Sequence, residues 1–406
     1  MAPRPPLHLA VALDGAGWHP AAWRAPDARP RDLFTAGYWR DLVTEAERGL
    51  LDLVTIEDGL ALQSADPFRP DDRTDAVRGR LDAVLVAARV APLTRHVGLV
   101  PTVVATHTEP FHVSKAIATL DHVSLGRAGV RVRISARPDE AALFGRHAVP
   151  PLDPRGPLAP DQEQLVADLL DEAGDHVEVQ RRLWDSWEDD AEIRDAATGR
   201  FIDRDRLHYI DFIGRRFSVK GPSITPRPPQ GQPVVAVLAH TEPVVRLGAR
   251  VADVVLVTPR DAADAARLVA LVRREQEAAG RGGETVHVLA DVAVLLDASP
   301  AAARDRREHL DELAGDLVPA GGYTGDDAHL VTGTAAELAD LLLEWQDAGV
   351  SGFRLRPATL PHDLEAVTRA LVPLLQDRGA FRQGYATSTL RGHLGLARPA
   401  NRYATA

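Results

Sequence analysis

The sequence contains no cysteine and only two lysines, Lys115 and Lys220, among its 47 basic residues. Without cysteine, the chain forms no disulfide, thiolate metal site, iron–sulfur cluster or cysteine nucleophile. No run of about 18 apolar residues is present, so we predict no membrane-spanning helix. The net charge of −11 argues against nucleic-acid binding, which usually requires a basic patch. The opening residues, MAPRPP, lack the apolar segment of a signal peptide, and we expect a cytoplasmic protein.

Common catalytic and nucleotide-binding motifs are also missing. There is no Gly-x-Gly-x-x-Gly, P-loop or Gly-x-Ser-x-Gly pattern, so the chain has no fingerprint for binding NAD. His107 and His112 are five residues apart and would face different sides of a helix, which does not make a zinc pair. We therefore predict no metal site.

Short apolar segments alternate with longer amphipathic ones along the whole chain, which is typical of a parallel sheet covered by helices. Eight segments are candidate strands, the number that a TIM (β/α)8 barrel needs. The predicted strands are 8–13, 51–56, 97–103, 130–135, 234–238, 254–257, 286–296 and 352–355. The predicted helices include 38–49, 76–90, 109–122, 162–187, 243–251, 262–279, 300–314, 335–348 and 364–378. The fold class is thus α/β, with one barrel domain spanning 1–406.

Two long insertions after the fourth predicted strand interrupt this alternation. Segment 137–160 is rich in proline and has no clear periodicity, and segment 188–229 follows the motif Trp184-Asp-Ser-Trp187. Long insertions in a barrel usually shape the mouth of the active site. We therefore expect both insertions to form a lid.

Polar residues at the predicted strand ends are candidate functional residues, because TIM-barrel active sites lie at the C-terminal ends of the strands. They are Asp58, Thr102, Thr106, Arg131, Arg133, Ser135, His240, Thr241, Arg354 and Arg356. His240 and Thr241 follow a strand and open a helix, where a hydroxyl, free amides and an imidazole can bind an anion. Simple helix capping by Thr241 explains the same pattern. Asp58 precedes a glycine and fits a solvated turn equally well, and Thr106 fits a helix cap.

Several ordered segments resemble the bacterial-luciferase-like monooxygenases, in the branch containing nitrilotriacetate and dibenzothiophene-sulfone monooxygenases. The segments 46–62, 101–129, 182–190 and 389–402 carry the resemblance, including Thr108-Glu-Pro and Leu125-Gly-Arg-Ala-Gly129. The resemblance extends over nearly the whole chain and implies a flavin-dependent TIM barrel.

The resemblance implies an FMNH2-dependent monooxygenase of a two-component system. It would take reduced FMN from a separate NAD(P)H:flavin reductase and insert oxygen from O2 into a small organic substrate. A homodimer or dimer of dimers is implied as well. Residues carried over as cofactor-binding are Asp58, Thr102, Thr106, Arg131, Ser135, His240 and Thr241, with Arg131 and His240 also as catalytic candidates. Trp18, His19 and Trp23 are expected to line the substrate pocket.

Two departures from the family pattern bear on cofactor binding. The fourth strand has Arg131 where the family has asparagine, and this arginine fits either a donor to the flavin or an ion pair. The family's histidine and tyrosine phosphate ligands fall on Val166 and Leu170, so we expect FMN to bind weakly. Two alternatives stay open: a non-catalytic barrel that has lost flavin binding, and a deazaflavin-dependent oxidoreductase.

Overall fold

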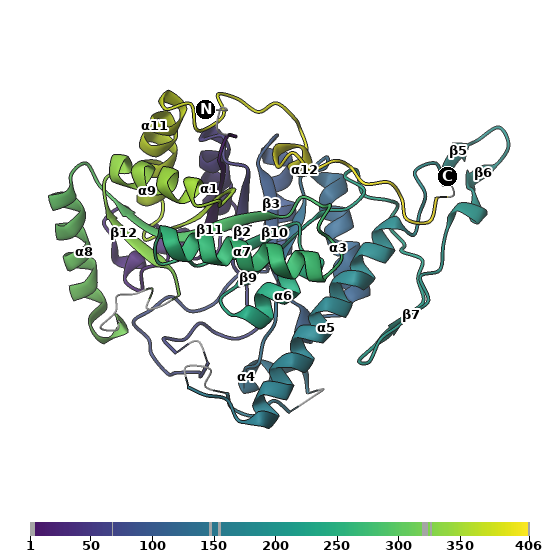
Figure 1. Ribbon diagram of the computed structural model, residues 1–406, viewed down its shortest axis with the longest axis horizontal. Helices are drawn as coiled ribbons and strands as arrows, with labels where there is room; N and C mark the ends of the chain where they lie inside the picture. The colour runs from purple at the N-terminus through teal and green to yellow at the C-terminus, as the bar shows by residue number, and fades with distance from the viewer. Residues whose placement is uncertain are drawn as a thin grey trace.

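Parallel strands form a closed barrel at the centre of the molecule (Figure 1). The computed structural model describes residues 5–66, 68–145, 148–152, 156–318, 324 and 327–404. Within these ranges the barrel strands are β1 (His8–Leu13), β2 (Leu53–Ile56), β3 (Gly98–Val104), β4 (Gly129–Arg133), β9 (Val234–Ala239), β10 (Val254–Val257), β11 (His287–Leu296) and β13 (Gly352–Pro357). The order is β10-β9-β4-β3-β2-β1-β13-β11, and pairing of β10 with β11 closes the ring. The prediction of a TIM barrel with these eight strands is confirmed.

Helices surround the barrel and follow the strands in sequence. They are α1 (Ala36–Arg48), α2 (Ala83–Val90), α3 (Pro110–Val123), α5 (Pro160–Asp185), α6 (Glu242–Val251), α7 (Ala262–Ala278), α8 (Pro300–Ala314), α9 (Ala335–Asp347), α10 (His362–Ala366) and α11 (Val372–Asp377). The helix predicted at 76–90 starts only at Ala83, because Gly79 has a φ of 89° and Asp82 caps the helix through Leu85 N. None of the described helices has the length and apolarity to cross a bilayer.

Strand β12 (His329–Gly333) was not predicted. It pairs with the second half of β11, beyond the part of that ten-residue strand that pairs with β10. The long β11 therefore carries one extra strand outside the barrel. Asp327, two residues before β12, contacts Arg356 near the C-terminal end of β13.

Helix α4 (Pro138–Phe144) of the first insertion and the hairpin of β5 (Glu192–Asp195) with β6 (Arg200–Ile202) of the second lie at opposite ends of the barrel (Figure 1). Segment 137–160 contains α4, which follows β4 directly and lies at its C-terminal end. Helix α5 is 26 residues long, about 39 Å at 1.5 Å per residue, and leads the chain to the other end. The hairpin of β5 with β6 follows there. The hairpin of β7 (Phe212–Ile213) with β8 (Ser218–Val219) runs back beside α5, where Arg215 pairs with Asp168.

The expectation of a lid is wrong for segment 188–229. Just after it, the Gln230 side chain donates to Ala128 O, immediately before β4, and to Asp121 at the end of α3. These contacts place the end of the insertion against the N-terminal ends of the strands. The length of α5 is the physical reason, because it returns the chain across the barrel before the insertion begins.

The barrel interior changes from apolar to charged along its axis. Near the N-terminal ends the inward side chains form an apolar cluster that includes Leu53, Val100 and Leu289. Leu390, on the short helix α12 (Leu390–His393), closes this end and packs against Gly98 and Gly129. A Cβ at Gly98 would lie 2.5 Å from a methyl group of Leu390, so glycine leaves the room that this plug needs. Toward the C-terminal ends, charged side chains replace the apolar ones.

Candidate functional site

Five buried charged residues fill the barrel above its apolar layers, and we call them the charge network. They are Arg131, Glu57, Arg354, Asp291 and Arg356, each no more than 8% exposed. They point inward because successive residues of a strand alternate between the two faces, and β11 and β13 are in a register that pairs Arg354 with Asp291.

The network begins on β4. Arg131 pairs with Glu57, and its Nε donates to Thr102 Oγ1 at 3.0 Å. Arg354 Nη1 donates to Glu57 Oε1 at 3.1 Å and to Thr55 Oγ1, also at 3.1 Å. Burial lowers the pKa of Arg131 to about 10 despite the opposing charge of Glu57, so it stays protonated at neutral pH. Burial would raise the pKa of Glu57, but the positive charges of Arg131 and Arg354 hold it below its ordinary value.

The network continues to the barrel mouth. Arg354 Nη2 donates to Asp291 Oδ2 at 2.6 Å, and Arg356 Nε donates to the same oxygen at 2.8 Å. Arg356 Nη1 pairs with Asp327, whose side chain is 48% exposed. His240 Nε2 lies 3.0 Å from Asp327 Oδ1. The chain of contacts therefore runs from β4 across the barrel to the end of β9.

The predicted site residues do gather at one end of the barrel. Asp58, Ser135 and Thr241 follow β2, β4 and β9, which belong to the same run of parallel strands. Thr106 Oγ1 accepts from Ser135 N at 3.0 Å, joining the ends of β3 and β4. Asp58 accepts from Gly59 N at 2.7 Å and Ala83 N at 2.8 Å, and burial raises its pKa. These bonds give Asp58 a structural role, and a contact with flavin stays a prediction.

The structure tests the ion pair expected as one explanation of Arg131 and the helix capping expected as one explanation of Thr241. Arg131 lies in an ion pair, with Thr102 as a further partner. Thr241 occupies the N-cap position of α6, but its side chain makes no capping hydrogen bond with the described residues. Its hydroxyl is exposed, so the explanation by side-chain capping is wrong.

The three residues expected to line a substrate pocket each contact a different part of the structure. The guanidinium of Arg356 is 4.6 Å from the centre of the Trp18 ring, which places Trp18 at the network. The buried His19 contacts Asp311 of α8 at 2.9 Å, and Trp23 Nε1 donates to Asp75 O. Only Trp18 of the three is shown to contact the network.

The two positions of the missing phosphate ligands are both apolar and lie on α5. Leu170 is buried in the core, and Val166 packs partly against it. Neither side chain can donate a hydrogen bond, so neither replaces the family's polar ligand.

Sequence reasoning missed Glu57, Asp291, Asp327 and Glu140. A signal was present for Asp291, which is the one charged residue inside the apolar run of β11. Glu57 stands next to Asp58 at a strand end. Nothing local marks Asp327, because its partners Arg356 and His240 are distant in sequence.

A donor and an unsatisfied acceptor lie together near Gly59. Arg133 Nη1 donates to Asp58 O at 3.0 Å, and Glu140 on α4 is 2% exposed with no partner for Oε2 among the described residues. A Cβ at Gly59 would lie 3.6 Å from the Arg133 side chain and 3.7 Å from that of Glu140. The pyrimidine edge of a flavin offers carbonyl acceptors and an N–H donor, so these groups fit that edge. His240 and the free Thr241 hydroxyl fit a phosphate.

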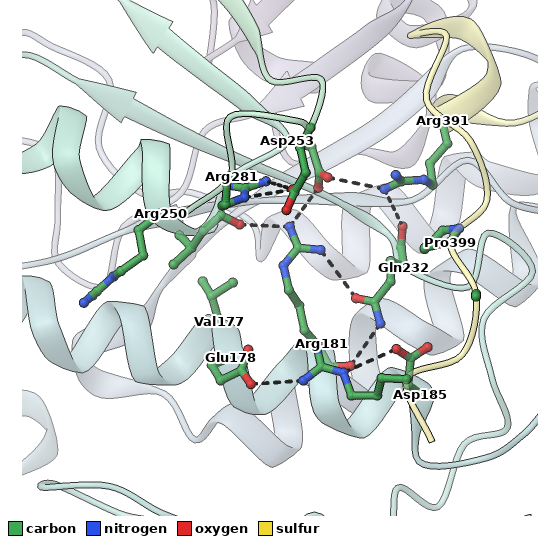
Figure 2. A pocket seen from close by; sticks show the side chains of 14 residues that line it. Val177, Glu178, Arg181, Asp185, Gln232, Arg250, Asp253, Arg281, Arg391 and Pro399 are labelled. Carbon is green, nitrogen blue, oxygen red and sulfur yellow. Dashed lines mark hydrogen bonds and ion pairs between the residues drawn. The ribbon is translucent and has the colours of Figure 1, made fainter. Parts of the chain in front are cut away.

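A separate cavity of 370 Å³, which we call the basal cavity, lies at the N-terminal ends of β9 and β10. Figure 2 shows Asp253 at its centre, between Arg181 of α5 and Arg391 of the C-terminal segment. Asp253 also accepts from Val235 N at 2.9 Å. Arg181 donates to Val251 O at 2.8 Å and Arg391 to Gln232 O at 3.2 Å. The charged groups thus tie loops together.

Comparison with known proteins points to one family. Residues 16–352 match the model of the luciferase-like monooxygenases. N-acetyl-S-(2-succino)cysteine monooxygenase from Bacillus subtilis is 30% identical, covering 98% of both chains. Nitrilotriacetate monooxygenase component A from Aminobacter aminovorans is also 30% identical, covering 97% of both chains. A riboflavin lyase structure with modified FMN and riboflavin matches with a TM-score of 0.84 and 26% identity, covering 96% of both chains.

Proposed function

The chain belongs to the luciferase-like monooxygenase family, and we propose on this basis that it is a flavin-dependent monooxygenase acting on a small organic substrate. The observation that supports this most directly is the pair of groups beside Gly59, where Arg133 donates and the buried Glu140 has an oxygen without a partner in the described part of the chain. An unpaired buried carboxylate oxygen is costly, and a ligand N–H would remove that cost.

Reduced FMN, when bound, would supply the electrons for the reaction with O2. Arg133 and Glu140 would hold the edge of its ring, and Thr241 would bind its phosphate at the start of α6. Asp58, Thr102, Thr106 and Ser135 would shape the wall between these two ends. The positive charge of Arg131 below would favour an anionic ring.

Helix α4 would exclude water from the ring. It follows β4 directly and carries the buried Glu140 toward Gly59. We therefore keep the prediction of a lid for segment 137–160, with α4 as the part that covers the site. Exclusion of water strengthens each charge interaction inside the site.

The source of reducing equivalents is a second protein in this proposal. The sequence has no NAD-binding fingerprint, and one relative is named as component A of a monooxygenase. We propose a separate NAD(P)H:flavin reductase as the partner, and a homodimer or dimer of dimers as the assembly. Sedimentation at micromolar concentration tests the assembly, and a monomer there would contradict it.

Anaerobic titration with reduced FMN tests the cofactor site. We expect weak binding, because Val166 and Leu170 supply no polar group, and a colourless protein after purification. Glu140→Ala should weaken binding about tenfold, the effect of losing one hydrogen bond to a charged group. Glu163→Ala, on the exposed start of α5, is the matched control and should bind as the wild type does.

The outcomes separate the alternatives. Binding of a deazaflavin but not FMN would favour the deazaflavin oxidoreductase. Binding of neither at millimolar concentration would favour a non-catalytic barrel. The apolar Val166 and Leu170 are consistent with that alternative, because they supply no ligand for a flavin phosphate. A yellow protein with stoichiometric flavin would contradict weak binding.

A further inference from the structure

The charge network is not neutral by itself. Among the described residues it contains three arginines, Arg131, Arg354 and Arg356, and two carboxylates, Glu57 and Asp291. All five side chains are charged at neutral pH, so the network carries one excess positive charge. A buried charge without a counterion is strongly unfavourable, so an anion is required nearby.

Asp327 supplies that anion from outside the barrel. It belongs to the connection that leads from α8 to β12, and its side chain is 48% exposed while Arg356 is 1% exposed. Burial would raise the pKa of Asp327, but the hydrogen bond from His240 and the charge of Arg356 lower it. Among the described residues, its carboxylate is thus a counterion held by the side chains of Arg356 and His240, and it is open to solvent on one side.

Arg356 is fixed in a way that presents one nitrogen to this position. Its Nε donates to Asp291 at 2.8 Å, and Nη2 lies 2.6 Å from the same carboxylate oxygen. The Trp18 ring covers the guanidinium. Nη1 is left to meet Asp327, with His240 on the other side of the carboxylate.

We propose that Arg356 and His240 form a binding site for a carboxylate group of the substrate, and that Asp327 occupies this site when substrate is absent. The incoming carboxylate takes the contacts of the Asp327 carboxylate and restores the same charge balance. This inference rests on the proposed function, because it names the substrate class of the same barrel mouth.

A single carboxylate fits the site better than a phosphate does. The network lacks one negative charge, which one carboxylate supplies. A phosphate monoester carries about −1.5 to −2 at neutral pH, and would leave excess negative charge close to the carboxylates of the network. The flavin phosphate is therefore assigned to Thr241 at the exposed start of α6, and His240, whose Nε2 faces Asp327, is assigned to the carboxylate alone.

The test uses the full-length protein without flavin and isothermal titration with succinate and with succinamide, its uncharged analogue. Wild type should bind succinate and not succinamide. Asp327→Asn removes the competing charge and should bind succinate several-fold more tightly, up to about fivefold, because the half-exposed pair that succinate no longer has to displace is a weak one. His240→Asn should bind it several-fold more weakly. Asp316→Asn is the matched control, because Asp316 lies between α8 and β12, is 80% exposed and pairs with Arg73.

Four results would overturn the proposal. They are equal affinity for succinate and succinamide, no succinate binding by either wild type or Asp327→Asn, unchanged or weaker binding by Asp327→Asn, and an equal gain in Asp316→Asn. A parallel anaerobic titration with reduced FMN and reduced riboflavin distinguishes the flavin phosphate as the anion. If Asp327→Asn strengthens FMN but neither riboflavin nor succinate binding, the site belongs to the phosphate.

The same data separate this inference from the proposed function. Succinate binding that responds to Asp327→Asn, in a protein that binds no flavin, would support the anion site and contradict the monooxygenase. Flavin binding, together with a succinate affinity that does not change in Asp327→Asn, would support the monooxygenase and contradict the anion site.

Discussion

The two ends of the barrel both use arginine, but they use it differently. At the basal cavity, Arg181 and Arg391 donate to backbone carbonyls as well as to the buried Asp253. In the charge network, Arg354 and Arg356 bond only to side chains in the described structure. Arginines that bond to the backbone tie segments of the chain together, whereas an arginine such as Arg356, bonded in the described structure only to carboxylates, can exchange an outer carboxylate for another anion.

The two ends also differ in how deeply the carboxylate that pairs with the arginines is buried. Asp253 is buried, and the charges of Arg181 and Arg391 lower its pKa although burial opposes this. Asp327, the outermost counterion of the network, is half exposed. The first arrangement stabilises a fold, and the second leaves a position that a ligand can take.

The largest effect should come from the centre of the network. Asp291→Asn leaves Arg354 and Arg356 without their shared carboxylate, and removing one partner of a buried ion pair costs about 3–5 kcal/mol. We expect the free energy of unfolding in urea to fall by that amount. Asp253→Asn should have an effect of similar size at the other end. A loss below about 1 kcal/mol, the range of surface pairs, would mean that water already reaches Asp291.

The second-largest effect should be a change of stability with pH, which arises at the N-terminal end of the barrel. His287 is buried at the start of β11, close to His8, and burial lowers its pKa to about 4. The unfolded chain takes up the proton near pH 6.5 while the folded state does not, so stability falls as the pH drops from 6.5 to 4. The expected loss is about 3 kcal/mol.

Urea unfolding across this pH range measures the effect of His287. His287→Gln should flatten the curve, because glutamine keeps a donor for Leu394 O, the partner of Nε2 at 2.7 Å, but does not titrate. An unchanged pH dependence in that variant would assign the loss to other groups.

The smallest effect should come from Asp327. Its substitution by asparagine opens the outer side of Arg356 to water and dissolved anions, which replace the half-exposed carboxylate, and half-exposed pairs contribute less than about 1 kcal/mol. The free energy of unfolding of Asp327→Asn should therefore stay within that distance of wild type, against the large loss in Asp291→Asn. A loss as large as that of Asp291→Asn would show that Asp327 is a fixed part of the fold and would remove the contrast between the two ends.

Much of the fold followed from local patterns in the sequence. The strands 8–13 and 254–257 and the helix 300–314 have the predicted bounds, because apolar runs and caps act over a few residues. Strand β12 was missed because it lies outside the barrel and pairs only with the extended β11. The position of 188–229 depended on the length of α5 rather than on its own composition.

The candidate site was predictable in location but not in its contacts. The rule that barrel sites lie at strand ends identified Arg131, His240 and Arg356 as candidates. Their partners Glu57 and Asp327 join segments far apart in the chain, and no local pattern records such a pairing.

The plug formed by Leu390 has a consequence for synthesis of the protein. Leu390 packs against Gly98 and Gly129 inside the barrel, yet it follows all eight barrel strands in the chain. On the ribosome, β3 and β4 therefore emerge long before the side chain that fills the space between them. The base of the nascent barrel is therefore packed only after all eight strands and α12 have left the exit tunnel.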